Sequence, residues 1–179
     1  MDEKVIIAGF GGQGIMLAGK LLVQAGLCLG RQVTFIPSYG AEVRGGTAHC
    51  HVIVSDEEIA SPIITVPDAA VVMNSPSLLK FSGLVKSGGA ILVNSSIAAE
   101  KVERTDVRAA LIPANRLAEE LGSVKIANVV MLGAYMRYSR FLTPDALVSA
   151  LKVLLSSRHR DLVTMNLAAL RKGYEYQVC

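Results

Sequence analysis

Residues 4–22 read KVIIAGFGGQGIMLAGKLL, and this stretch decides the fold. The apolar run Lys4–Ala8 predicts a buried strand, and the glycines that follow it predict a tight turn. From Ile15 to Leu29 the apolar residues recur every three or four positions, which predicts a helix with one apolar stripe. A strand that passes through glycines into a helix is the first half of a βαβ unit.

The same alternation of strand and helix continues along the chain. Further strands are predicted at 33–36, where Pro37 is expected to stop the strand, and at 48–54, 69–73, 90–94 and 109–112. Ser75, Asn115 and Thr143 are expected to cap helices, and two more helices are predicted at 128–137 and 162–172. We therefore predict one α/β domain over residues 1–179. Its sheet is open, mostly parallel and doubly wound, with helices on both faces and a helical C-terminal part.

The composition limits the classes of function. Of the 179 residues, 51% are apolar and 18% are charged, which excludes a disordered or fibrous chain. We expect a cytoplasmic protein, because no apolar run is long enough for a membrane span and no cleavable leader precedes the first strand. The net charge of +3 is too small to indicate nucleic acid. Cys28, Cys50 and Cys179 form no CxxC pair, so their thiolates alone could not hold an iron–sulfur cluster.

The glycine turn is the first candidate binding site, and its proposed cofactor-binding residues are Gly9, Gly11, Gly12, Gln13 and Gly14. They form a GxGxxG pattern between a strand and a helix, where glycines let the backbone approach a ligand and free N–H groups attract phosphate. The acidic residue that would hold a nucleotide ribose at the end of the second strand is absent, which disfavours dinucleotide binding. Close packing of the helix on the sheet is the alternative interpretation.

The second candidate is the loop PSYGAEVRGGT, residues 37–47. Its candidate binding residues are Ser38, Tyr39, Glu42, Arg44, Gly45 and Thr47. Arg44 could clamp a carboxylate or phosphate, and Tyr39 could stack on a ligand or donate a hydrogen bond. Alternatively, Glu42 and Arg44 pair with each other or across a subunit contact. In a doubly wound sheet this loop is expected beside the glycine turn.

The histidines indicate neither a metal centre nor a catalytic one. His49 and His51 share one face of a predicted strand, whereas Cys50 faces the other way. Since no third ligand is obvious, we interpret both as structural or interface residues. The chain also has no recognisable nucleophile–base set and no GDG…N-type stretch for thiamine diphosphate. We therefore predict no catalytic and no metal-binding residues, and a chain that is catalytically incomplete on its own.

Two motifs together suggest a family. The stretches GFGGQGI (9–15) and PSYGAEVRGGTA (37–48) resemble the gamma subunit of 2-oxoacid:ferredoxin oxidoreductases, in the pyruvate/ketoisovalerate oxidoreductase catalytic domain family. The likeness continues through Ser61-Pro62, Pro67-Asp68 and residues 73–77, and it covers essentially the whole chain. The tyrosine-containing loop is more similar to the 2-oxoglutarate and branched-chain 2-oxoacid members than to the pyruvate members.

The resemblance implies one subunit of a complex that converts a 2-oxoacid and coenzyme A into acyl-CoA, CO₂ and reduced ferredoxin. In the family, thiamine diphosphate and Mg²⁺ lie between alpha and beta subunits, and the iron–sulfur clusters lie in a ferredoxin-like or beta subunit. The expected partners are therefore these three subunits, and no cofactor is expected on this chain alone. The glycine turn and the Arg44 loop would shape the approach of coenzyme A.

Two other classes of function stay open from the sequence. One is a freestanding nicotinamide- or flavin-dependent oxidoreductase built on the glycine turn. The other is a non-enzymatic module that binds a phosphorylated ligand. Neither nucleic acid nor a membrane is expected as a partner, and a homodimer of the isolated chain is an open alternative.

Overall fold

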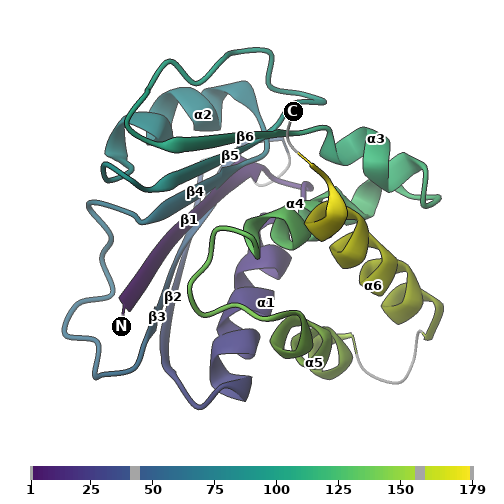
Figure 1. The fold of residues 1–179 in the computed structure, drawn as a ribbon, viewed down its shortest axis with the longest axis horizontal. Coiled ribbons are helices and arrows are strands. Elements are labelled where there is room, and N and C mark those ends of the chain that lie inside the picture. Colours follow the sequence, from purple (N-terminus) through teal and green to yellow (C-terminus); the bar gives the residue numbers. More distant parts are fainter. Residues whose placement is uncertain (1, 41–44, 156–159, 178–179) are drawn as a thin grey trace.

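Six strands form a single open sheet in the computed structural model, which describes residues 2–40, 45–155 and 160–177. The strands follow the spatial order β2-β3-β1-β4-β5-β6 (Figure 1). They are β1 (Asp2–Phe10), β2 (Gln32–Tyr39), β3 (Thr47–Ser55), β4 (Ala69–Val72), β5 (Ala90–Asn94) and β6 (Arg108–Ile112). Strands β1, β4, β5 and β6 pair in parallel, and β3 runs antiparallel to both of its neighbours. The predicted α/β class with a mostly parallel sheet is confirmed.

Helices cover the two faces of the sheet unequally. Five helices contribute to the larger apolar core on one face, and α2 packs on the other (Figure 1). The helices are α1 (Ile15–Cys28), α2 (Ser75–Phe81), α3 (Ala114–Glu119), α4 (Ala127–Tyr135), α5 (Pro144–Leu154) and α6 (Arg160–Glu175), with short 3₁₀ turns η1 (Ser82–Leu84) and η2 (Val124–Ile126). Within the described part of the chain, no helix is both long and apolar enough to cross a membrane.

Strand β3 separates β1 from β2, although α1 connects those two strands directly along the chain. Val52 of β3 lies opposite Val5 of β1 on one side and opposite Phe35 of β2 on the other. The chain therefore returns from β2 as a hairpin that inserts into the sheet. This insertion carries the start of β3 to the end of β1, where Phe10 pairs with Thr47.

Pro37 does not stop the second strand, and the prediction that it would is wrong. Strand β2 continues through Pro37 to Tyr39 because it is an edge strand. Gly40 donates its N–H to the carbonyl of Thr47 (2.7 Å), and hydrogen-bonded pairs alternate along an antiparallel ladder. Pro37, opposite Cys50, is therefore at a position whose nitrogen faces away from β3, and the missing N–H costs no ladder bond.

The helix caps are partly as predicted. Thr143 caps α5, because its hydroxyl accepts from the N–H of Ala146 (3.2 Å). At α2 the cap is Asn74 rather than Ser75, with its side chain accepting from the N–H of Ser77 (2.9 Å). At α3 the expected cap Asn115 is wrong, because it lies inside the first turn and its side-chain oxygen accepts from Asn94.

Helices α4 and α6 touch through their backbones. A Cβ added to Gly133 would lie 2.1 Å from the carbonyl oxygen of Leu170, and one added to Gly173 would lie 1.9 Å from that of Val130. Backbone atoms cannot move aside as a flexible side chain can. The two glycines therefore permit a close crossing that holds the last helix against the core.

Candidate functional site

The carboxyl ends of β1, β4, β5 and β6 meet at one edge of the sheet, where ligands bind in open α/β folds. The glycine turn follows β1, and Asn74 follows β4. Ser95 and Ser96 follow β5, and Pro113 follows β6. The first candidate site of the sequence therefore lies at the same edge as polar side chains that follow two other strands, β4 and β5.

The glycine turn is held closed by its own residues and by β3. The Gly11 N–H donates to the carbonyl of Gly46 (2.8 Å), which ties the turn to the segment before β3. Gln13 accepts from the N–H of Phe10 through Oε1 (2.7 Å) and donates from Nε2 to the carbonyl of Met73 (3.4 Å). The side chain of Gln13 therefore braces the turn against the end of β4.

The glycines of this turn have different roles. A Cβ at Gly9 would lie 2.5 Å from Oε1 of Gln13, and a Cβ at Gly14 would lie 2.4 Å from the amide nitrogen of Asn128. Both positions thus serve close packing. Gly12 has a φ of 98°, and an added Cβ there would meet nothing within 4 Å. Gly12 is where the backbone of the turn faces open space.

The second candidate loop is only partly described. Gly45 and Thr47 lie beside the glycine turn, as the pairing of Phe10 with Thr47 shows. Ser38 and Tyr39 lie in β2, with β3 between them and β1, and Tyr39 is 58% exposed. Glu42 and Arg44 lie outside the described residues.

The two histidines form a tilted stack on the α2 side of the sheet. The ring centroids of His49 and His51 are 5.5 Å apart, and that of His49 is 5.0 Å from the ring of Phe81. Burial, then Lys80 and His51, lower the pKa of His49 to about 4, and burial and Lys80 lower the pKa of His51. Across residues 2–40, 45–155 and 160–177, no three His, Cys, Asp or Glu side chains are grouped to hold a metal ion.

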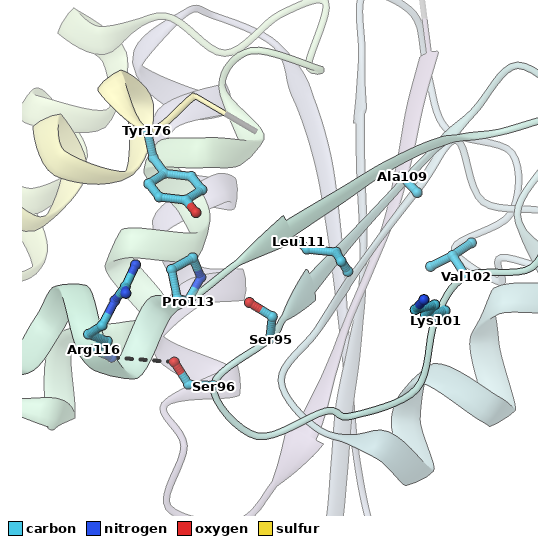
Figure 2. A pocket seen from close by; sticks show the side chains of 9 residues that line it. All are labelled: Ser95, Ser96, Lys101, Val102, Ala109, Leu111, Pro113, Arg116 and Tyr176. Atoms are coloured by element: carbon cyan, nitrogen blue, oxygen red, sulfur yellow. Dashed lines mark hydrogen bonds between the residues drawn. The ribbon is translucent and has the colours of Figure 1, made fainter. Parts of the chain in front are cut away.

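A hollow at the ends of β5 and β6 was not predicted from the sequence. We call it the β5–β6 hollow; its volume is about 650 Å³ (Figure 2). It is lined by Ser95, Ser96, Lys101, Val102, Ala109, Leu111, Pro113, Arg116 and Tyr176. Two serines directly after the predicted strand 90–94 were the available signal, but Tyr176 is about eighty residues further along the chain.

Asn94, the last residue of β5, is buried and joins the chain segments next to this hollow. Its side-chain oxygen accepts from the N–H groups of Ala114 (3.1 Å) and Ser96 (3.3 Å), and its amide donates to Asn115 (2.9 Å). The Ser96 hydroxyl accepts in turn from the N–H of Arg116 (3.3 Å; Figure 2). Asn94 at the end of β5 and Ser96 just after it therefore accept hydrogen bonds from N–H groups at the start of α3.

Together, the sheet and its polar carboxyl edge define an α/β module of the class that binds ligands at strand ends. The model of the family "Pyruvate ferredoxin/flavodoxin oxidoreductase" matches residues 4–176. The chain is 38% identical over 176 residues to ketoisovalerate oxidoreductase subunit VorA of Methanothermobacter thermautotrophicus. The match covers 98% of this chain and 36% of VorA, so this chain spans about a third of that relative's length.

Solved structures of oxidoreductases that act on 2-oxoacids are also similar to this chain. The gamma subunit of keto/oxoacid ferredoxin oxidoreductase from Geobacter sulfurreducens superposes with a TM-score of 0.82 at 27% identity, covering 97% of this chain and 96% of that one. The 2-oxoglutarate:ferredoxin oxidoreductase of Magnetococcus marinus, with 2-oxoglutarate, coenzyme A and succinyl-CoA bound, gives a TM-score of 0.87 at 25% identity and covers 97% of this chain and 30% of that one. The chain belongs to the pyruvate ferredoxin/flavodoxin oxidoreductase family, and the predicted resemblance to its gamma subunits is confirmed.

Proposed function

We propose that this chain is the gamma subunit of a cytoplasmic 2-oxoacid:ferredoxin oxidoreductase, and that its carboxyl edge shapes the approach of coenzyme A. The family match over residues 4–176 carries the proposal. The structure of the Magnetococcus enzyme supports the ligand, since it contains coenzyme A and includes a region similar to nearly all of this chain. The alpha, beta and ferredoxin-like subunits would be its partners.

The proposed reaction converts a 2-oxoacid, coenzyme A and two oxidised ferredoxins into acyl-CoA, CO₂, two reduced ferredoxins and a proton. Thiamine diphosphate on the partner subunits would supply the electron sink that the decarboxylation needs. This chain would position coenzyme A rather than make or break bonds. Gly12 offers exposed backbone, and Gly45–Thr47 lie beside it, so a ligand could approach the main chain closely there.

Two features of the sheet disfavour the alternative of a freestanding dinucleotide enzyme. Strand β3 lies between β1 and β2, so the end of the second strand is not next to the glycine turn. The Gly11 N–H is also engaged by the carbonyl of Gly46. We expect no tight binding when the isolated chain is titrated with NAD(H), NADP(H) or FAD and followed by fluorescence.

Reconstitution tests the proposal directly. The chain is co-purified with its partner subunits, and the reduction of ferredoxin is measured with 2-oxoacid and coenzyme A. We expect activity that needs both substrates and that is lost when this chain is omitted. Full activity without the chain, or rapid reduction of a redox dye by the chain alone, would contradict the proposal.

The role proposed for Arg44 needs a separate variant. In the assembled complex, Arg44→Ala should lower turnover through weaker capture of coenzyme A or through assembly. Arg31→Ala is the matched control, because Arg31 forms an ion pair with Asp56 at the opposite edge of the sheet. Unchanged kinetics in a correctly assembled Arg44→Ala complex would remove that role.

A further inference from the structure

Another cavity lies at the amino ends of the parallel strands, at the edge of the sheet opposite to the glycine turn. It is formed by residues at or just before the starts of β1, β4, β5 and β6, and by two residues from the connection between α4 and α5. We call it the amino-edge cavity; its volume of about 230 Å³ is room for about eight water molecules. The charged side chains of its lining are Glu3, Asp68, Lys86, Arg108 and Arg140.

The carboxylate of Glu3 is already engaged by donors of the chain itself. Its side chain is buried, with Glu3 only 2% exposed. One oxygen of Glu3 accepts from the hydroxyl of the buried Tyr135, and the other accepts from the backbone N–H of Arg140 (2.7 Å). These bonds hold the connection after α4 against the start of β1.

The carboxylate of Asp68 is shared between two cations. One of its oxygens pairs with Lys86 and with a terminal guanidinium nitrogen of Arg140 (2.9 Å). The other accepts from the backbone N–H of Lys4 (2.7 Å), which fixes the orientation of the side chain. Lys86 and Arg140 therefore divide a single negative charge between them.

Arg108, the first residue of β6, is the third cation of the cavity. No carboxylate of the described residues pairs with it, and its guanidinium lies over the ring of Tyr138, 5.3 Å from the ring centroid. A guanidinium that stacks on an aromatic face keeps the N–H donors at its own edge available. Since three cations face two carboxylates, the lining carries one net positive charge, and Arg108 has donors to spare.

The backbone around the cavity is closely packed. The carbonyl of Asp68 accepts from the N–H of Ala90 (3.0 Å), and a Cβ added to Gly89 would lie 2.6 Å from that same carbonyl oxygen. The side chains that face the cavity are thus carried by strand ends that cannot easily separate. A ligand would find its charged partners already positioned, so little ordering would oppose its binding.

We propose that the amino-edge cavity binds an oxyanion group, a phosphate or a carboxylate, with Arg108 as its principal donor. The planar donors of a guanidinium match the paired oxygens of both groups. The volume lies below the range of about 300–1,000 Å³ that is typical of sites for drug-sized ligands, so the ligand is a small anion or one charged group of a larger partner. This site goes beyond the proposed function, because it lies at the edge of the sheet that coenzyme A is not proposed to use.

A residue-resolved titration of the full chain tests the site. The ¹⁵N-labelled chain is titrated with inorganic phosphate, and with chloride at the same ionic strength as the reference. We expect phosphate, and not chloride, to move the amide signals of Gly88, Gly89 and Tyr138, which line the cavity. The signal of Gly12 reports any phosphate at the glycine turn separately, so the two edges of the sheet are distinguished.

Two variants should change the affinity for phosphate in opposite directions. Arg108→Gln should weaken it by about three- to tenfold, because it removes one partly solvated charge from the anion. Asp68→Asn should strengthen it by about the same factor, because the amide keeps the size of the carboxylate and removes the charge that Lys86 and Arg140 share. Lys125→Gln is the matched control, because it removes an exposed charge of η2 outside the cavity.

Cavity signals that phosphate does not move in the wild type would overturn the proposal. So would an unchanged affinity in Arg108→Gln, or the absence of a gain in folded Asp68→Asn. None of these results bears on the proposed function, since the titration needs no partner subunit and no coenzyme A.

The assembled complex then identifies the source of the anion. If a partner subunit supplies a carboxylate to the cavity, Arg108→Gln should lower the affinity of this chain for its partners by about three- to tenfold. If the anion is free in solution, assembly should be the same for Arg108→Gln and the wild type. Both results support the site once the titration has shown it, and they assign it to an interface or to a small-molecule ligand.

Discussion

The side-chain amide of Asn128, in the first turn of α4, donates to the carbonyl of Gly14 at the start of α1 (3.0 Å), across 114 residues of sequence. The same amide fills the space that a side chain at Gly14 would need. The glycine turn is thus shaped by a helix from the C-terminal half as well as by its own residues.

Gly14→Ala should therefore destabilise the protein more than Gly12→Ala. Both glycines have positive φ, at 73° and 98°, so both substitutions strain the backbone. Only the methyl group at Gly14 would overlap Asn128, which we expect to add about 1–3 kcal/mol to the loss. Urea unfolding of the two variants measures the difference. A Gly14→Ala variant that unfolds no more easily than Gly12→Ala would contradict the packing role.

Substituting a glycine at the α4–α6 crossing should destabilise the protein more than the change at Gly14. Gly173→Ala would place a methyl group against the carbonyl of Val130, and we expect it to lower the free energy of unfolding by about 3 kcal/mol. Gly83→Ala is the control, because that position is open and its φ is not positive, so the change should stay within about 1 kcal/mol. Thermal and urea unfolding both test this. Equal stability of the two variants would contradict the inference that α4 and α6 need a glycine at position 173 to pack closely.

Asn94 should contribute more to the stability of the folded chain than its partner Asn115 does. In Asn94→Ala the buried N–H of Ala114 loses its acceptor, so we expect a loss of about 2–3 kcal/mol in the free energy of unfolding. Asn115→Ala breaks only the bond from the buried Asn94 amide, whereas Asn94→Ala breaks three hydrogen bonds, so Asn115→Ala should cost less, about 1–2 kcal/mol. The order of the two variants in a denaturant titration is the measurement, and the reverse order would contradict the proposed bracing of α3.

His49 should make stability depend on pH in weakly acidic solution. Its pKa is about 4 in the folded chain and near 6.5 when unfolded, so the unfolded chain binds more protons between these values. The free energy of unfolding should fall as the pH drops from 6.5 toward 4. Because the ring is only half buried, we expect His49→Gln to remove about 1 kcal/mol of this fall. Parallel pH profiles for the variant and the wild type would contradict this.

The two described cysteines should differ in reactivity. Burial raises the pKa of Cys50 to about 12, and its thiol donates to the carbonyl of Ile15. Cys28 is exposed. A thiol reagent at pH 8 should therefore modify Cys28 in the folded protein and Cys50 only after unfolding, because the thiolate is the reacting form. Mass spectrometry of digested samples identifies the site, and rapid modification of Cys50 would contradict its burial.

Local patterns in the sequence predicted most of the fold. Apolar runs and turn glycines placed all six strands along the chain. The direction of β3 was not predictable, because its first half alternates as antiparallel strands commonly do, whereas its second half is as continuously buried as a parallel strand. The role of Gly173 was equally hidden, since a glycine inside a helix looks only unfavourable until its neighbour is known.

The candidate site was predicted where a motif is continuous in sequence. The glycine turn is one stretch, and the structure places it at the carboxyl edge of the sheet. The β5–β6 hollow joins Ser95, Lys101, Arg116 and Tyr176, which are scattered along the chain. No periodicity links such residues, so only the packing of α6 against α4 brings the last of them to this edge.

The reversed direction of β3 has a practical consequence for labelling. Because β3 leads the chain away from the glycine turn, the exposed turn that begins at Asp56 emerges at the far edge of the sheet, where Ser55 pairs with Asp2. A fluorophore attached through Glu57→Cys would therefore sit remote from both the turn and the hollow. It could report the association of subunits without obstructing the surface that coenzyme A is proposed to use.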